Sequence, residues 1–129
     1  MSQVSSGTLS AAALAYLGDA VYEVYVRRHH LVPWAGRATC HRRVVAQVRA
    51  EAQAHHLQTL MPYLTPAEHQ VIQRGRNGAG RPPRTVDWAT YRQATALEAL
   101  VGHLHLTDPT RLETLLGLLN LDQPVPPSP

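Results

Sequence analysis

The stretch from Leu14 to Arg27 restricts the possible folds more than any other part of the chain. Its apolar residues recur in alternating steps of three and four, the period of one buried helix face; they are Leu14, Leu17, Val21, Val24 and, further on, Leu31. Gly18 interrupts this helix, where glycine costs about 1 kcal/mol relative to alanine. A helix that accepts this cost needs another backbone or a ligand close beside it. The stretch therefore predicts a helix from about residue 9 to residue 30, with a core face and a point of close approach.

An acidic residue lies next to that point of approach. Asp19 follows Gly18, and Asp19, Glu23 and Arg27 are four residues apart. Residues at this spacing share one side of a helix. The helix therefore combines a core face with a polar stripe that begins at Asp19.

The rest of the chain also reads as helical. Start signals occur at Thr65–Pro66, at Asp87 and at Asp108–Pro109, where a capping side chain precedes a helical run. The predicted helices, five in all, cover residues 9–30, 38–60, 65–74, 88–106 and 108–121. With 129 residues and no alternating strand pattern, we expect one all-α domain over residues 1–121. The proline-rich residues 122–129 are expected to form a disordered tail.

A second acid stands in a small-residue environment. Glu98 has Ala94, Thr95, Val101 and Gly102 within one helical turn, and none of them is cationic. A buried carboxylate must be paired, protonated or bound to a metal ion. If Asp19 and Glu98 face each other, Mg²⁺ could lie between them, because this ion accepts one or two protein carboxylates and keeps water on its other positions. The alternative is that arginines pair with both acids across the core, and spacing alone favours that alternative.

Positive charge is concentrated in the middle of the chain, which has a formal net charge of +3. No carboxylate interrupts the run between Glu23 and Glu51, which contains Arg27, Arg28, Arg37, Arg42, Arg43 and Arg49. A second group lies in the glycine-rich segment 73–84, with Arg74, Arg76, Arg81 and Arg84. We predict that residues 75–83 form a mobile loop. Such basic segments suit a polyanionic partner, although an unevenly charged solvated surface explains them equally well.

Several other classes of site lack their signatures. Cys40 is the single cysteine, which excludes a disulfide framework and favours a reducing compartment. The histidine pairs 29–30 and 55–56 are adjacent, and adjacent residues on a helix point apart, so we expect surface or core histidines rather than metal ligands. No Gly-Lys-Ser phosphate loop or Gly-x-Ser-x-Gly elbow occurs. The sequence also shows neither a secretory signal nor a membrane-spanning run.

The segment Leu14-Ala15-Tyr16-Leu17-Gly18-Asp19-Ala20-Val21-Tyr22-Glu23 strongly resembles the defining segment of the ribonuclease III family. More narrowly, the chain resembles the Mini-ribonuclease III branch, which consists of the nuclease domain alone. Further pieces agree in order: His41 with Gln53–Ala54, the run 74–77, Tyr91–Arg92 with Ala94–Thr95, and the run 97–102. The resemblance covers roughly residues 9–121 and rests on several separate motifs.

This resemblance implies an all-α, ribonuclease III-type endonuclease domain that forms a homodimer, with the Gly18–Asp19 helix near the two-fold axis. It implies Mg²⁺-dependent hydrolysis of both strands of double-stranded RNA, leaving 5′-phosphate and 3′-hydroxyl ends. By position, Asp19 matches the catalytic aspartate and Glu98 the metal-binding glutamate. Larger relatives place two further acids around the metal, where this chain has Ala15 and Thr95.

The resemblance also assigns an RNA-binding role to the basic segments. The residues expected to contact RNA are Arg74, Arg76, Asn77, Arg81, Arg84, Arg42 and Arg43. It suggests precursor 23S ribosomal RNA as the natural target and the cytoplasm as the compartment. A non-catalytic RNA-binding or ribosome-associated module on the same fold is the alternative, and a helical DNA-binding regulator is a third, weaker one.

Overall fold

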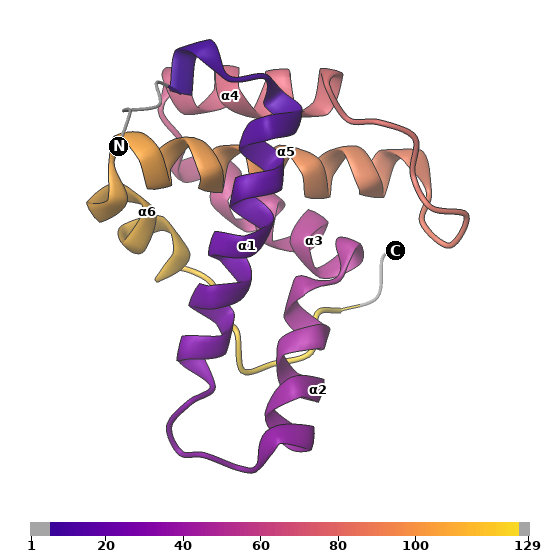
Figure 1. Cartoon of the computed structure of the whole chain (residues 1–129), viewed down its shortest axis with the longest axis vertical. Coiled ribbons are helices and arrows are strands. Elements are labelled where there is room, and N and C mark those ends of the chain that lie inside the picture. Colours follow the sequence, from indigo (N-terminus) through magenta and orange to yellow (C-terminus); the bar gives the residue numbers. More distant parts are fainter. Residues whose placement is uncertain (1–5, 127–129) are drawn as a thin grey trace.

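The computed structural model describes residues 6–126 and is built from helices around a central one, α5 (Figure 1). No strand occurs within this described range. The α-helices are α1 (Ala11–His29), α2 (Arg37–Val48), α3 (Ala50–Leu60), α4 (Pro66–Asn77), α5 (Trp88–Thr107) and α6 (Pro109–Leu116). Two short 3₁₀ turns, η1 (Ser6–Thr8) and η2 (Met61–Tyr63), accompany them. The prediction of an all-α fold is confirmed, and none of the described helices is both long and apolar enough to cross a membrane.

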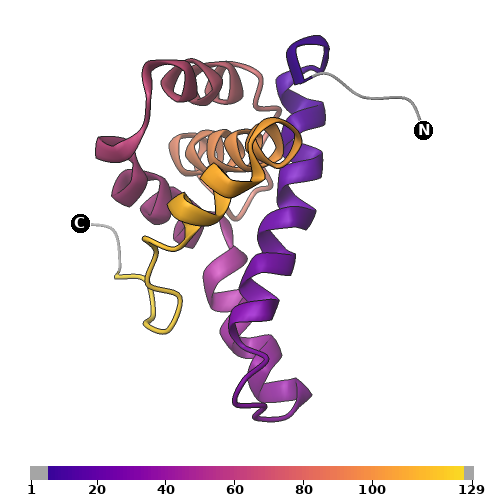
Figure 2. The ribbon, with the colours of Figure 1, turned by 90° about the vertical axis from the view of Figure 1, so that its left-hand side faces the viewer.

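Helix α5 forms the centre of the core. It begins at Asp87, whose side chain accepts a hydrogen bond from the amide of Thr90 at 2.8 Å, as the sequence predicts. Most of its residues from 94 to 104 are buried, and α1, α3, α4 and α6 all contact it. Figure 2 shows α5 nearly end-on, enclosed by these helices. A helix that is apolar on most sides is the expected occupant of such a position.

Helix α1 crosses α5 and buries a face offset from the predicted one. Ser10 caps it by accepting from the amide of Ala13 at 3.1 Å. Its buried residues are Leu14, Ala15, Gly18, Tyr22 and Val26, whereas Val24 is 56% exposed and Leu31 is 51% exposed. The predicted core positions Val24 and Leu31 are therefore wrong. The buried face of α1 is offset from the predicted one because Gly18 faces α5 and Tyr22 points into the core. The hydroxyl of Tyr22 donates to the carbonyl of Gln47 at 2.9 Å.

Two glycines allow α1 and α5 to meet at backbone distance. A Cβ added to Gly18 would overlap the backbone carbonyl of Glu98, and one added to Gly102 would overlap the carbonyl of Leu14. The close approach predicted at Gly18 is confirmed, and its partner is a helix of the same chain. Asp19 is thereby brought next to Glu98.

The single helix predicted over residues 38–60 is wrong, because the chain breaks at Arg49. Arg49 has extended dihedrals (φ −66°, ψ 156°) and separates α2 from α3. Gln53, only 3% exposed, donates from Nε2 to the carbonyl of Val48 at 2.7 Å and so satisfies a group freed by the break. The described chain consequently has six α-helices instead of five.

Helix α4 is longer than predicted and takes over part of the expected loop. It ends at Asn77 rather than near Arg74, so Arg76 and Gly75 are helical. Gly75 is buried, and a Cβ there would lie 2.7 Å from the Cα of Ala96. The glycine at this position allows α4 to pack closely against α5. The prediction that residues 75–83 form a mobile loop is therefore wrong for Gly75.

The start of the proline-rich tail packs against the domain, which differs from the predicted disorder. Asp122 contacts His29 at 2.8 Å, and the carbonyl of Gln123 accepts from Gln47 Nε2 at 2.9 Å. Val125 is only 8% exposed. Residues 127–129 lie outside the described range, and the division of the chain at residue 121 stays a prediction.

We expect Glu68→Gln to lower the free energy of unfolding by about 1–3 kcal/mol at pH 7. Glu68 is 6% exposed and binds Arg111 through both carboxylate oxygens at 3.0 Å, which joins α4 to α6. The Arg111 guanidinium holds the pKa of Glu68 below its ordinary value of 4.5. A lowered pKa in the fold stabilises it above about pH 4.5, and that stability is lost as the pH falls further.

Urea unfolding between pH 3 and pH 7 tests this, with Glu113→Gln as the matched control. Glu113 also binds an arginine, Arg28, at 3.3 Å, but both side chains are more than half exposed. Its removal should cost less than about 1 kcal/mol. Equal losses in the two variants would contradict the assigned role of the buried pair.

Candidate active site

A pocket of about 230 Å³ opens where α1 crosses α5. Helix α1 contributes Asp19 and α5 contributes Glu98, while the segment after α4 closes one side. The described residues that line it are Ala12, Ala15, Tyr16, Asp19, Gly78, Gly80, Tyr91, Thr95 and Glu98. The two acids selected from the sequence therefore share one cavity, formed by the glycine-mediated crossing.

The two carboxyl groups interact directly. Burial, a hydrogen bond with Asp19 and the negative charge of Asp19 together raise the pKa of Glu98 to about 8. The Gln53 side chain acts in the opposite direction, because its amide donates to the Glu98 carboxylate. Asp19 is exposed at the pocket mouth, and Glu98 is half-buried behind it. At neutral pH, and with no cation bound, the pair therefore holds one proton most of the time.

The alternative of arginine pairing across the core finds no support in residues 6–126. None of the ion pairs in this range includes Asp19 or Glu98. In addition, the buried Oε1 of Gln53 has no hydrogen-bond partner, although Gln53 is a neighbour of Glu98. Two adjacent carboxyl groups, no neutralising cation and an unpaired amide oxygen fit a site for a hydrated divalent cation.

The positions at which larger relatives carry further acids lie in the same pocket. Ala15 and Thr95 both line it, as their spacing from Asp19 and Glu98 implies. Their small side chains leave room beside the acids. The protein side of any metal site here would consist of two carboxylates, with space for water or phosphate oxygens.

The arginines near this pocket have different environments. Arg74 donates to the carbonyl of Leu9 at 3.0 Å, and Arg76 donates to Gln93 Oε1 at 3.0 Å. Asn77 accepts from Gln73 at 3.2 Å. Arg81 and Arg84 are exposed on the segment between α4 and α5, close in sequence to the pocket residues Gly78 and Gly80. These last two arginines are therefore the better candidates for an RNA contact.

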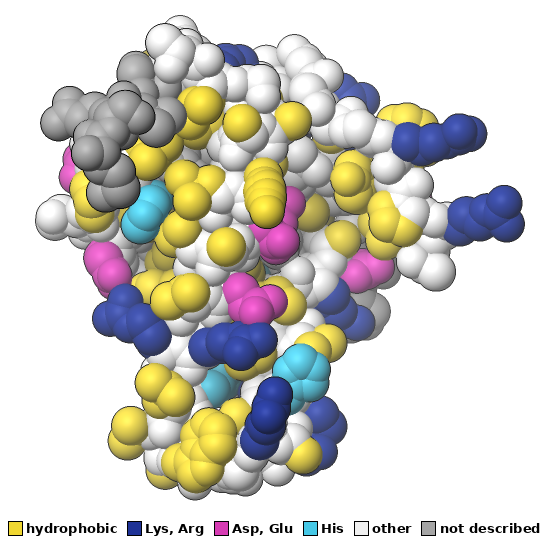
Figure 3. All heavy atoms as spheres, viewed as in Figure 1, with side chains coloured by type: hydrophobic (Ala, Val, Ile, Leu, Met, Phe, Trp, Pro, Cys, Tyr) yellow, Lys and Arg dark blue, Asp and Glu magenta, His cyan; other side chains and the backbone are white. Residues whose placement is uncertain are grey.

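The structure does not bring Arg42 and Arg43 to this group. Both belong to α2, which lies at the opposite end of the molecule from α4 (Figure 1). In Figure 3, basic side chains at the lower end of the molecule are far from those at the right-hand edge, and others lie at the top and across the middle of this face. The predicted RNA-binding residues thus fall into two sets within one chain.

Sequence reasoning missed the pocket roles of Tyr91, Gly78 and Gly80 and the contact of Gln53 with Glu98. Gln53 and Tyr91 belong to motifs of the family resemblance, but a glutamine or a tyrosine does not by itself indicate that the residue lies at an active site. A glutamine in a helical run carries no signal for a contact made across the core. These contacts depend on the break at Arg49 and on the path of the chain after α4.

We expect the metal-free protein to lose stability as the pH rises from 6.5 to 8.5. Glu98, with a pKa of about 8 in the fold against an ordinary value of 4.5, binds a proton in the fold that the unfolded chain has released. The free energy of unfolding should fall by up to about 1.4 kcal/mol per pH unit. Mg²⁺ should offset this loss, because it binds the ionised form.

Urea unfolding in the presence of a chelator, with and without Mg²⁺, measures the effect, and Glu98→Gln should abolish it. Burial lowers the pKa of His56 to about 4 in the fold, against an ordinary value of 6.5, so the unfolded chain still loses part of a proton from His56 just above pH 6.5. This contribution has the opposite sign and is the same in Glu98→Gln, so the difference between the two slopes reports Glu98. A wild-type slope identical to that of Glu98→Gln would show that Glu98 does not hold the proton.

Comparisons with known proteins identify the family. Residues 12–109 match the Ribonuclease III domain family. A protein named Mini-ribonuclease 3 from Synechocystis sp. is 50% identical over 119 residues, which cover 92% of this chain and 83% of the relative. Another of that name, from Gloeobacter violaceus, is 47% identical over 100% of this chain and 98% of its own.

The fold is confirmed independently by a crystal structure of a protein from Fusobacterium nucleatum. It superposes with a TM-score of 0.79 at 27% identity and covers 86% of this chain and 92% of its own. The all-α prediction and the family resemblance are both confirmed by these matches. The chain belongs to the ribonuclease III family, in the branch whose members carry the name Mini-ribonuclease 3.

Proposed function

We propose that this protein is an endoribonuclease that hydrolyses double-stranded RNA with Mg²⁺ held by Asp19 and Glu98. The observation that carries the proposal is the shared pocket, in which two adjacent carboxyl groups have no cationic partner among residues 6–126 and the pKa of Glu98 is raised to about 8. Family membership supplies the reaction class. The expected products have 5′-phosphate and 3′-hydroxyl ends.

When bound, Mg²⁺ supplies stabilisation of the negative charge that develops at the scissile phosphate and acidifies the attacking water. Asp19 and Glu98 would hold the ion as carboxylates, after the proton on Glu98 has been released. Gln53 donates to Glu98 and favours its ionised form. Ala15 and Thr95 leave the remaining space for phosphate oxygens.

The segment after α4 is proposed to contact the RNA backbone. Gly78 and Gly80 line the pocket without side chains, so a phosphate can approach the main chain there. A-form RNA is recognised largely through its shape and its phosphates, which suits the exposed Arg81 and Arg84. Arg74, Arg76 and Asn77 support this segment from α4, and Arg42 and Arg43 form a second proposed contact set.

We expect the double substitution Arg81→Ala/Arg84→Ala to weaken binding of double-stranded RNA by about ten-fold or more at moderate salt. Each phosphate contact removed should also make the logarithm of affinity less steeply dependent on salt, by roughly one unit of slope per contact. Fluorescence anisotropy at several salt concentrations measures both quantities.

Arg28→Ala serves as the control for net charge, since Arg28 is exposed and bound to Glu113 at 3.3 Å, away from the pocket. It should leave the affinity within about two-fold. If Arg81→Ala/Arg84→Ala binds like wild type, the segment after α4 does not grip the RNA.

A homodimer with one pocket per chain would place one active site on each RNA strand. The outer side of α1 carries the exposed apolar side chains Tyr16 (76% exposed) and Val24 (56% exposed), and apolar side chains are visible over α1 in Figure 3. An apolar helix face of this kind favours association. Sedimentation as a monomer at micromolar concentration would contradict this part of the proposal.

Incubation of the purified protein with double-stranded RNA, single-stranded RNA and double-stranded DNA, with and without Mg²⁺, tests the activity. We expect cleavage of the double-stranded RNA alone and only with Mg²⁺. Binding of RNA without cleavage would instead establish the non-catalytic module. Precursor 23S ribosomal RNA in the cytoplasm is the proposed natural substrate, and mapping the ends produced on that precursor tests it.

A further inference from the structure

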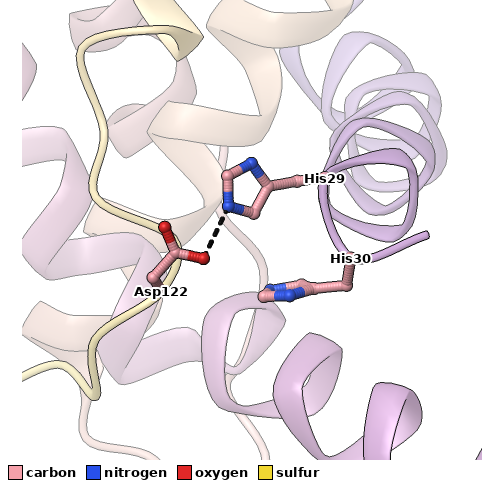
Figure 4. A group of neighbouring side chains, drawn as sticks. All are labelled: His29, His30 and Asp122. Carbon is pink, nitrogen blue, oxygen red and sulfur yellow. Dashed lines mark hydrogen bonds and ion pairs between the residues drawn. The ribbon is translucent and has the colours of Figure 1, made fainter. Parts of the chain in front are cut away.

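Two histidines and an aspartate converge where the end of α1 meets the C-terminal segment. His29 Nε2 lies 2.8 Å from Asp122 Oδ1, and the rings of His29 and His30 are edge to face with centroids 4.9 Å apart. One potential ligand atom from each of the three residues lies within 4.8 Å of the others. Figure 4 shows the three side chains directed toward a common point. This cluster lies ten residues beyond Asp19 along α1, or about 15 Å at the helical rise.

The end of α1 explains why adjacent histidines can converge. Helix α1 ends at His29, and His30 adopts non-helical dihedrals (φ −97°, ψ 10°) at the cap. The rule that adjacent helical side chains point apart therefore does not apply to this pair, so that argument against a shared metal ligand does not hold at the end of α1. The two histidine side chains can converge because the helix ends between them, and the sequence predicts the end of this helix at residue 30.

The C-terminal segment is held in place on both sides of Asp122. The carbonyl of Leu121 accepts from His30 Nε2 at 3.1 Å, and the carbonyl of Gln123 accepts from Gln47 Nε2 at 2.9 Å. His30 is 7% exposed and Gln47 is 2% exposed. These two hydrogen bonds do not involve the side chains of His29 and Asp122. They fix the backbone on both sides of Asp122 and so position its carboxylate beside the histidines.

The chemistry of this set selects a particular class of ion. Two imidazoles and one carboxylate are ligands that Zn²⁺, Co²⁺ and similar ions accept, with water completing the site. Because His30 Nε2 donates to a carbonyl, the Nδ1 lone pair of its neutral ring is available. Tetrahedral coordination needs ligand atoms about 3.4 Å apart, which the exposed side chains of His29 and Asp122 can reach by small movements. The nearby Arg42 and Arg43 line the adjoining cavity and disfavour ions bound by charge alone, such as Mg²⁺.

We propose that His29, His30 and Asp122 form a second metal site, specific for imidazole-binding divalent ions such as Zn²⁺, which ties the C-terminal segment to the end of α1. A metal ion there would take the place of the hydrogen bond between His29 and Asp122, with Nε2 of His29 and a carboxylate oxygen of Asp122 as ligand atoms. The site does not depend on the proposed nuclease function, because it shares no residue with the Asp19–Glu98 pocket.

Titration of the full, untagged chain with Co²⁺ and Zn²⁺ tests this site. We expect one equivalent of Co²⁺ to bind with micromolar or tighter affinity and to give visible d–d absorption, and Zn²⁺ to displace it. Asp122→Asn and His29→Asn each change an exposed residue and should weaken binding at least ten-fold. The same two variants should lose the rise in melting temperature that Zn²⁺ gives to wild type.

Two control variants separate this site from other ligands. Asp19→Asn removes a carboxylate of the nuclease pocket and should retain the Co²⁺ spectrum. His105→Asn removes another exposed histidine and should also bind like wild type. Binding weaker than about 100 μM in wild type, or an unchanged affinity in Asp122→Asn, would overturn the proposal. Loss of the spectrum in Asp19→Asn would do so too, because the ion would then occupy the nuclease pocket.

Discussion

Replacing Asp19 by asparagine, or Glu98 by glutamine, is expected to abolish cleavage of double-stranded RNA while leaving RNA binding nearly intact. Within residues 6–126, the two side chains are the only carboxylates that line the pocket. An amide of the same size keeps the shape and removes the negative charge that attracts Mg²⁺. Because stabilisation of charge at the phosphate depends on that ion, we expect a rate loss of at least about 10³-fold.

The matched control is Glu23→Gln. Glu23 lies one turn beyond Asp19 on α1 and forms an exposed ion pair with Arg27 at 2.8 Å. It carries the same charge on the same helix but does not line the pocket. Single-turnover cleavage should be within about two-fold of wild type in this variant. Cleavage by Asp19→Asn or Glu98→Gln at the control rate would remove the two acids from the mechanism.

Glu98→Gln also offers a second signature that a merely structural residue would not give. Ionised Glu98 beside Asp19 destabilises the metal-free fold, as its raised pKa of about 8 indicates. The glutamine variant should therefore be more stable than wild type at pH 8.5 without metal, although its activity is lost. Where two repelling groups are kept because the function needs them, a substitution that removes one group raises the stability and lowers the activity.

The helical fold was predictable because its local signals agree with its packing. The capping box at Thr65 and Glu68 and the caps at Asp87 and Asp108 all lie where the sequence places them. The acids Asp19 and Glu98 were found because each adjoins small residues and a glycine. Their meeting in one pocket follows from Gly18 and Gly102, whose mutual approach is a long-range contact that residue types only suggest.

The missed features are tertiary. Nothing in the local sequence marks Arg49 as a break. The carbonyl of Val48, which the break leaves without a helical partner, accepts instead from the side chain of Gln53 five residues later. The end of α4 at Asn77 was misplaced because Gly75 reads as a loop residue, whereas it serves close packing against Ala96. Likewise, the contact of Asp122 with His29 joins residues 93 positions apart, so proline content alone suggested disorder.

The packing of α1 against α5 leads to a further expected result, the effect of Gly18→Ala. The added methyl group would overlap the backbone carbonyl of Glu98 and would lie 2.9 Å from the amide nitrogen of Gly102. Backbone atoms cannot rotate away as a flexible side chain can, so the two helices must separate. We expect a loss of at least about 3 kcal/mol in the free energy of unfolding, at or beyond the upper end for overpacked cores.

Gly80→Ala is the matched control, because a Cβ at Gly80 meets no atom within 4 Å. It should change stability by less than about 1 kcal/mol and can even raise it by restricting the unfolded chain. Urea unfolding of both variants measures the difference, and equal stabilities would show that α1 and α5 are not in backbone contact at Gly18.

The same substitution tests how the fold positions the nuclease site. Glu98 is both the residue whose carbonyl the new methyl group would strike and the residue whose carboxyl group faces Asp19. Helices forced apart at Gly18 therefore also separate the two carboxyl groups. Where Gly18→Ala still folds at low temperature, we expect weaker Mg²⁺ binding and a pKa of Glu98 below about 8, since its negative neighbour has moved away. Normal Mg²⁺ affinity in a folded Gly18→Ala protein would show that the crossing does not set the distance between the acids.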